Sequence, residues 1–183
     1  MSELKCYKGE VTVTERPATG MITVRGDLTA PEMIAAIRAV FGAELPGIRK
    51  VINCDAGQIA WMSPDELLLI VEHAAVFEWI AKLREALAGQ HVLVENVSDA
   101  WVQLSVSGKR MREVLAKLMP VDFAPESFAV GDFRRSRLAQ VAAAVWFADA
   151  ETAILLCFRS VSTYAFDTLS QAAASLQPDG LIS

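Results

Sequence analysis

The chain has 183 residues, 53% of them apolar, and a formal net charge of −5. This length suits one domain of ordinary size, and the acidic balance offers no basic surface for nucleic acid. The longest charge-free apolar run of note, residues 138–148, is far shorter than the roughly 20 residues that a membrane-spanning helix needs. We therefore expect a protein with neither a nucleic-acid nor a membrane partner.

The N-terminus and the cysteines favour a cytoplasmic location. Glu3 and Lys5 lie where a secretory signal peptide needs an apolar stretch. The cysteines Cys6, Cys54 and Cys157 are odd in number, widely spaced and without a Cys-x-x-Cys pair. This usage predicts reduced thiols, two of them in the core.

The spacing of apolar residues predicts strands and helices in short alternating units. The predicted strands are, in chain order, residues 11–14, 21–25, 51–53, 91–97, 101–106, 138–147 and 152–158. The predicted helices lie between Thr29 and Pro46, at 74–88, between Gly108 and Pro120, and at 161–176. Repeated units of strand, strand and helix predict an α+β fold with a mainly antiparallel sheet, in a single domain of residues 1–183.

Two local patterns near the start of the chain give more specific predictions. Pro17 and Gly20 separate the first two strands, which is typical of a β-hairpin. Thr29 and Glu32 have the spacing of a capping box, in which the two side chains satisfy free amides at the first turn of a helix.

Residues 58–71 allow two interpretations. Ser63-Pro64-Asp65-Glu66 has the form of another capping box, with proline at the first helical position. The unbroken apolar run 67–71 instead suits a strand that is buried on both faces. Periodicity alone does not decide between a helix and a turn followed by a strand.

Motifs for catalysis or cofactor binding are missing from the sequence. It contains no Gly-x-Gly-x-x-Gly, no P-loop and no Gly-x-Ser-x-Gly nucleophile elbow. His73 and His91 have no second histidine or cysteine at metal-ligand spacing. Asp65 and Glu66 are adjacent carboxylates, which diverge on a regular element. We expect no catalytic, cofactor-binding or metal site in this chain.

Partner binding is the function class that the composition favours, because an apolar excess usually marks contact surfaces. Tryptophan and arginine dominate the hot spots of interfaces. Trp101, Arg110, Arg134 and Arg135 are therefore candidate residues of a subunit interface. The alternative is that Trp101 lies in the core and the arginines are solvated, those around 134–137 at the entry to a strand.

Three stretches carry a resemblance to a known family. They are Trp61-Met-Ser-Pro-Asp-Glu-Leu-Leu-Leu-Ile70, the stretch from Val94 to Phe123 with Asn-Val-Ser-Asp and Val-Leu-Ala-Lys, and Phe158-Arg-Ser160 leading to Leu169 and Ala172. In this order they resemble the sarcosine oxidase gamma subunit family, best over residues 58–176. Ser63 replaces the usual glycine and Asn96 a frequent aspartate. The resemblance favours a turn and then a strand at residues 63–71.

This resemblance implies a fold similar to that of the folate-dependent aminomethyltransferases. It further implies a non-catalytic gamma subunit that supports the assembly of a cytoplasmic, heterotetrameric oxidase of sarcosine (N-methylglycine) with alpha, beta and delta partners. FAD, FMN, NAD and tetrahydrofolate would be bound by those partners. The alternatives are a stand-alone folate-binding or aminomethyltransferase-like module, the small subunit of a related N-methyl amino acid dehydrogenase, and a scaffold with no amine-oxidase partner.

Overall fold

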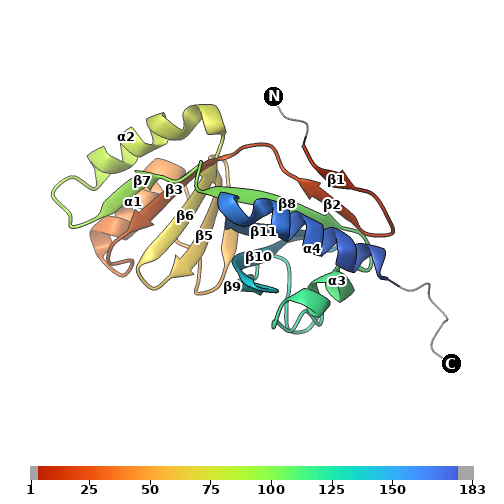
Figure 1. The fold of residues 1–183 in the computed structure, drawn as a ribbon. Coiled ribbons are helices and arrows are strands. Elements are labelled where there is room, and N and C mark those ends of the chain that lie inside the picture. Colours follow the sequence, from red (N-terminus) through yellow and green to blue (C-terminus); the bar gives the residue numbers. More distant parts are fainter. Residues whose placement is uncertain (1–3, 177–183) are drawn as a thin grey trace. The chain divides into compact units, whose positions relative to one another are not determined.

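The computed structural model describes residues 4–176, which form four α-helices and two β-sheets (Figure 1). The chain groups into two compact units. Unit 1 comprises Met1–Pro17, Val102–Val130 and Arg134–Ser183, and unit 2 comprises Ala18–Trp101 and Gly131–Phe133. The α+β class with antiparallel pairing is confirmed. A single domain over residues 1–183 stays a prediction, within which these units are the compact parts.

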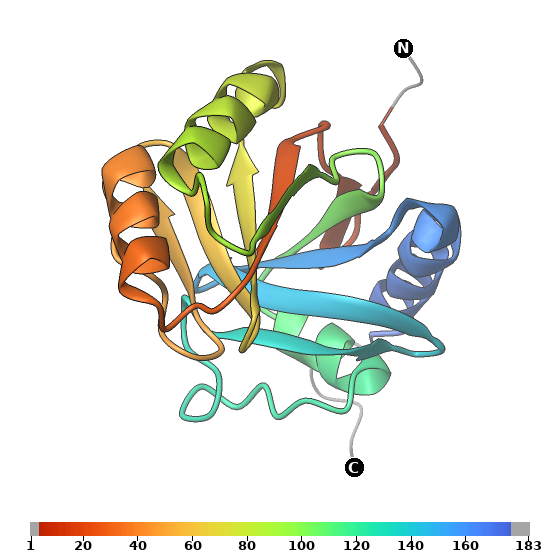
Figure 2. The ribbon, with the colours of Figure 1, turned by 90° about the vertical axis from the view of Figure 1, so that its left-hand side faces the viewer.

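Unit 2 is built from one nearly continuous segment. Its elements are β3 (Gly20–Arg25), α1 (Pro31–Phe41), β4 (Val51–Cys54), β5 (Gly57–Ser63), β6 (Glu66–Val71), a 3₁₀ turn (His73–Ala75), α2 (Val76–Ala86) and β7 (Leu93–Asn96). The strands lie in the order β4-β5-β6-β3-β7, with antiparallel neighbours. Helices α1 and α2 cover one face of this sheet (Figure 2) and bury its apolar side chains, including Ile22, Ile59 and Leu69.

Unit 1 is assembled from both ends of the chain. Its elements are β1 (Cys6–Tyr7), β2 (Thr12–Glu15), β8 (Trp101–Ser107), α3 (Met111–Leu118), β9 (Phe133–Leu138), β10 (Val141–Asp149), β11 (Thr152–Phe158), a 3₁₀ turn (Arg159–Val161) and α4 (Ser162–Ala174). The strands lie in the order β1-β2-β8-β11-β10-β9. The core between this sheet and α3 and α4 includes Leu104, Val145 and Leu155.

The two units repeat the same succession of elements. In sheet order, β4, β5, β6 and β3 of unit 2 correspond to β9, β10, β11 and β8 of unit 1. Helices α1 and α2 correspond to α3 and α4, and a 3₁₀ turn precedes both α2 and α4. Without its edge strand β4, unit 2 is the split β-α-β-β-α-β arrangement. The place of β7, the last strand of that arrangement, is taken in unit 1 by β2 from the N-terminus.

This repeat overturns the predicted N-terminal hairpin. The two predicted strands exist as β2 and β3, but β2 pairs with β1 and β8, whereas β3 pairs with β6 and β7. Pro17 therefore lies in the link between strands of different sheets, and Gly20 is the first residue of β3. The reason is that both strands find apolar partners far away in the sequence, a preference that local turn signals do not encode.

The predicted capping box at the start of α1 is also wrong. Ala30 is the N-cap and its side chain makes no capping bond, while Pro31 occupies the first helical turn. Thr29 instead donates from its hydroxyl and its amide to Asp27 Oδ1, at 2.6 and 2.8 Å. The helix ends earlier than Pro46, because Gly42 adopts the left-handed conformation (φ 66°) and its amide donates to the Arg38 carbonyl.

The ambiguous segment 58–71 resolves in favour of strands. Residues 57–63 and 66–71 form the hairpin β5–β6, with Pro64 and Asp65 in the turn. All five residues from Leu67 to Val71 are buried, which confirms a strand covered on both faces. Strand β9 was missed from the sequence, because three arginines among its six residues mask the strand pattern.

Candidate functional site

The first family motif lies in the β5–β6 hairpin, where its polar residues hold the sheet together. Glu66 Oε1 accepts from the Thr23 hydroxyl and Glu66 Oε2 from the Arg25 guanidinium, both at 2.9 Å. The Asp65 carbonyl accepts from the amide of Gly26. Glu66 thus ties the hairpin to β3, and a structural role explains the Pro-Asp-Glu motif without any acid/base chemistry.

The second motif forms the turn between β7 and β8. Asn96 Oδ1 accepts from the amide and the hydroxyl of Ser98, at 3.0 and 2.6 Å. The buried Ser98 hydroxyl oxygen in turn accepts from the Met21 amide at the start of β3. Asparagine reproduces here the acceptor that an aspartate would supply. The motif is visible in the sequence, but it does not predict that Ser98 bonds β3.

Arg110, one of the four predicted interface residues, stands at the N-terminus of α3 and makes internal ion pairs. Its guanidinium donates to both carboxylate oxygens of Glu113 at 2.7 Å and to Glu10 Oε2 at 3.1 Å. Its hydrogen bond lowers the pKa of the Glu113 carboxyl. With a side chain only 16% exposed, Arg110 joins the N-terminal segment to α3 and has little surface left for a partner.

The other predicted interface residues lie on two strands with different surroundings. Trp101 is half-buried at the start of β8. On β9, Arg134 is half-buried with its guanidinium 5.5 Å from the Phe128 ring centre, and Arg135 is exposed. Among the four, Arg135 presents most of its side chain to a partner. Their role as an interface stays a prediction.

A further arginine, Arg112, organises the loop after α3 and was not singled out from the sequence. Its guanidinium donates to the carbonyls of Phe123 and Phe128 and lies 4.5 Å from the Phe147 ring centre. These three phenylalanine rings pack together, with centroids 4.6 to 5.9 Å apart. The only sequence signal for this role is the position of Arg112 on α3, because the loop that it binds has no periodic spacing of apolar residues.

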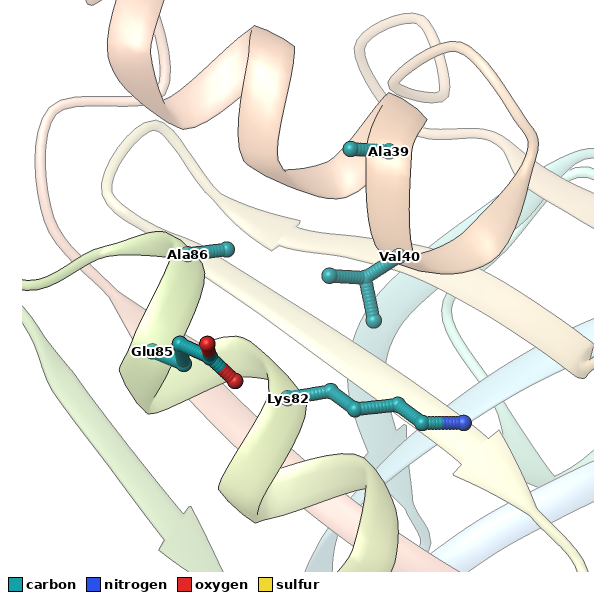
Figure 3. Close-up of a pocket in the computed structure, with 5 residues that line it drawn as sticks. All are labelled: Ala39, Val40, Lys82, Glu85 and Ala86. Atoms are coloured by element: carbon teal, nitrogen blue, oxygen red, sulfur yellow. The ribbon is translucent and has the colours of Figure 1, made fainter.

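An open groove of about 450 Å³ separates α1 and α2 in unit 2 (Figure 3). Ala39 and Val40 of α1 and Lys82, Glu85 and Ala86 of α2 line it. The Lys82 ammonium is already engaged, 2.7 Å from Glu78 and 4.6 Å from the Trp79 ring centre. The groove therefore combines small apolar side chains with charges of both signs, which does not match the phosphates of a flavin or nicotinamide cofactor.

The thiols and imidazoles do not assemble a reactive centre in the described part of the chain. Burial raises the pKa of the Cys157 thiol to about 11, so it is protonated at neutral pH. Cys54 is half-buried against the unit 2 core, and Cys6 is exposed, so one cysteine rather than two is fully buried. His73 and His91 are both exposed. Within residues 4–176, no three metal-ligating side chains come together.

Comparison with known proteins decides the family. The model of the family described as "Sarcosine oxidase, gamma subunit family" matches residues 25–175. The chain belongs to the sarcosine oxidase gamma subunit family. The match confirms the resemblance seen in the motifs and extends it toward the N-terminus, from residue 58 to residue 25 at the end of β3, so that it includes α1. None of the curated proteins matches this chain.

Solved structures agree with this assignment. A heterotetrameric sarcosine oxidase from Corynebacterium sp. U-96, in complex with pyrrole 2-carboxylate, has a chain that matches with a TM-score of 0.84 and 25% identity, over 94% of this chain and 90% of that one. Aminomethyltransferase T of the glycine cleavage system from Bartonella henselae matches with a TM-score of 0.62 and 13% identity, over 85% of this chain and 44% of that one.

A third match shows how widely the fold occurs. The regulatory subunit of aspartate kinase from Thermus thermophilus has a TM-score of 0.52 and 12% identity, over 91% of this gamma-family chain and 98% of that one. At such identities this match and the aminomethyltransferase show the fold alone, and the predicted likeness to the aminomethyltransferase fold is confirmed. Within residues 4–176, no helix is long and apolar enough to cross a membrane.

Proposed function

We propose that this chain acts as the gamma subunit of a cytoplasmic, heterotetrameric sarcosine oxidase and supports the assembly of its larger partners. The observation that carries the proposal is the reciprocal match to one whole chain of such an enzyme, over 94% of this chain and 90% of that one. Membership of the gamma subunit family supports it independently. The alpha, beta and delta subunits would bind FAD, FMN, NAD and tetrahydrofolate and carry out the oxidation.

The residues of this chain support a structural role within such a complex. The polar residues of the family motifs, Glu66 and Ser98, bond to neighbouring strands. The groove between α1 and α2 offers no anion site, and the buried Cys157 is no nucleophile. We further propose Arg135, Arg134 and Trp101 as contacts to the partners, with Arg135 the most accessible. Arg110 ranks last of the four, because Glu10 and Glu113 hold its guanidinium.

Co-expression with the alpha, beta and delta subunits tests this function. We expect the tagged gamma chain to co-purify with flavin absorbance, and sarcosine oxidation to fall when gamma is omitted. If the remaining subunits assemble and oxidise sarcosine fully without it, the proposal is wrong. Activity with another N-methyl amine in place of sarcosine would identify a related dehydrogenase.

Two further measurements separate the alternatives. Binding of a tetrahydrofolate analogue to the isolated chain, measured by calorimetry, would favour a stand-alone folate-binding module. Substitution of Arg135 by glutamate should weaken co-purification, whereas Arg38→Glu, on the exposed face of α1, is the matched control. Unchanged assembly of the Arg135 variant would remove this residue from the interface.

A further inference from the structure

Strand β7 lies at one end of the five-stranded sheet of unit 2, and its outer edge has a counterpart in unit 1. Strand β7 pairs with β3, and β2 pairs with β8, in equivalent places of the repeat. In unit 1 the outer edge of β2 is covered by the short strand β1, which pairs Cys6 with Thr14 and Tyr7 with Val13. Among residues 4–176, the sheet order of unit 2 ends at β7.

The register shows which groups of β7 point outward. The Val97 amide donates to the Met21 carbonyl, toward β3. Because hydrogen-bonding directions alternate along an antiparallel strand, the amides of Asn96 and Val94 point away from β3. Their counterparts in β2 are Glu15 and Val13, and the Glu15 amide donates to the Lys5 carbonyl of the covering segment. The edge of β7 thus presents two outward amides, at Val94 and Asn96, that correspond to the β2 residues facing β1 and Lys5 in unit 1.

The adjacent helix carries a second feature at the same place. Phe77, the second residue of α2, is 74% exposed. The second residue of α4 is Thr163, and Lys5 Nζ donates to its hydroxyl at 2.8 Å. A segment that covered β7 as residues 5–7 cover β2 would therefore pass over Phe77. Helix α2 and strand β7 lie side by side within unit 2 (Figures 1 and 2).

We infer that the edge of β7, together with Phe77, binds an extended segment of a large partner subunit by strand addition. This inference rests on the proposed function. Main-chain bonds to Val94 and Asn96 would supply affinity, and an apolar side chain at the position equivalent to Lys5 would contact Phe77, since that ring offers no acceptor. The chain's own residues 5–7 are already paired with β2, so a second copy could supply them only by losing that pairing.

Arg84 bonds one of the outward groups of the β7 edge. Its guanidinium donates to the outward Val94 carbonyl at 2.8 Å and lies 3.0 Å from Glu95. A carbonyl oxygen has two lone pairs, so an incoming amide bonds beside Arg84 or replaces it. Arginine thus protects the edge before the partner binds, in the manner of charged residues on edge strands.

The first test measures amide exchange in the assembled oxidase and in the isolated chain. The amides of Val94 and Asn96 should become protected on assembly, while the Glu95 amide, which faces β3, changes little. If the wild-type chain assembles and these two amides exchange as before, strand addition is wrong but the proposed function stands. If the wild-type chain does not assemble at all, the proposed function itself fails.

The second test compares Phe77→Glu with Ile48→Glu, since Ile48 is similarly exposed at 72% on a loop of unit 2. Phe77→Glu should weaken binding to the partner subunits by at least about tenfold, as expected of an aromatic hot spot, and Ile48→Glu should not. Ala81→Glu, one turn further along the exposed side of α2, provides a second variant, and thermal unfolding checks the fold of all three. Equal affinities of the Phe77→Glu and Ile48→Glu variants for the partner subunits would overturn the inference. Protection of the Val94 and Asn96 amides in a dimer of the isolated chain would also overturn it.

Discussion

The two units of this chain reach the same arrangement by different routes. Unit 2 runs from β3 to β7 nearly without interruption, whereas unit 1 takes its equivalent last strand from the N-terminus. The difference changes how each sheet edge is protected. Strand β1 covers β2, while the Arg84 side chain bonds the edge of β7. The same topology can therefore leave a sheet edge covered or open, and the neighbouring residues decide which edge can accept another chain.

The largest expected effect comes from the turn between β4 and β5. Gly57 has φ 141°, and a Cβ there would overlap the Ile70 carbonyl oxygen, a backbone atom that cannot move aside. Gly57→Ala should lower the free energy of unfolding by about 3 kcal/mol or more, measured by urea denaturation. Gly42→Ala is the control, because Gly42 also has a positive φ but no atom within 4 Å, and should cost about 1 kcal/mol. Equal losses would show that backbone conformation, and not the contact with Ile70, dominates.

Removing β1 should make the edge of unit 1 resemble that of unit 2. Deletion of residues 1–8 removes the packing of Tyr7 against the unit 1 core and the bond from Lys5 to Thr163. We expect a loss of about 2 kcal/mol and faster exchange of the Glu15 amide. Deletion of residues 1–3 alone is the control. An unchanged Glu15 amide would mean that β1 does not protect β2.

Substitution of Arg84 by methionine should leave the edge of β7 unprotected. The variant keeps an apolar stem but loses the bond to the Val94 carbonyl, so stability should fall by about 1 kcal/mol. The unprotected edge should also increase self-association in sedimentation experiments. Arg38→Met, which removes an exposed ion pair with Glu44, should cost less than about 0.5 kcal/mol. A monomeric Arg84→Met protein of unchanged stability would contradict the protective role of Arg84.

The smallest effect concerns acid stability at the start of α3. The hydrogen bond from Arg110 lowers the pKa of Glu113 in the folded chain below the ordinary value of 4.5. Stability from this pair is therefore present above that value and is lost as pH falls through the lowered pKa. Because the Glu113 side chain is half-exposed, solvent screens the pair and the loss should be small. Glu113→Gln should show a flatter dependence of stability on pH below 4.5 than the wild type, measured by denaturation at several pH values.

Elements were predictable from the sequence where their periodicity is strong. Helix α3 and strands β8 and β11 follow the predicted apolar spacing closely. Strand pairing was not predictable to the same degree, because β2 finds its partner β8 far along the chain. The N-terminal hairpin failed for that reason. Strand β9 failed because its arginines hide a strand whose first and last residues are buried.

The candidate site, too, was predictable only in part from the sequence. The motifs around Glu66 and Ser98 identified the family, but their bonds to β3 depend on the sheet register and could not be inferred from spacing. Arg110 is a candidate by its residue type, but most of its donors are used by Glu10 and Glu113. Phe77 could not be predicted as a contact from the sequence, because the exposure of an apolar residue is visible only once the helix faces are known.

The origin of β2 at the N-terminus also has a consequence for biosynthesis. This strand is synthesised before every strand of unit 2, whereas its partner β8 begins only at Trp101. All five strands of the unit 2 sheet are synthesised in the interval. In a nascent chain, β1 and β2 therefore have no β8 to pair with while the sheet of unit 2 can already form. Translation thus allows unit 2 to be completed before unit 1.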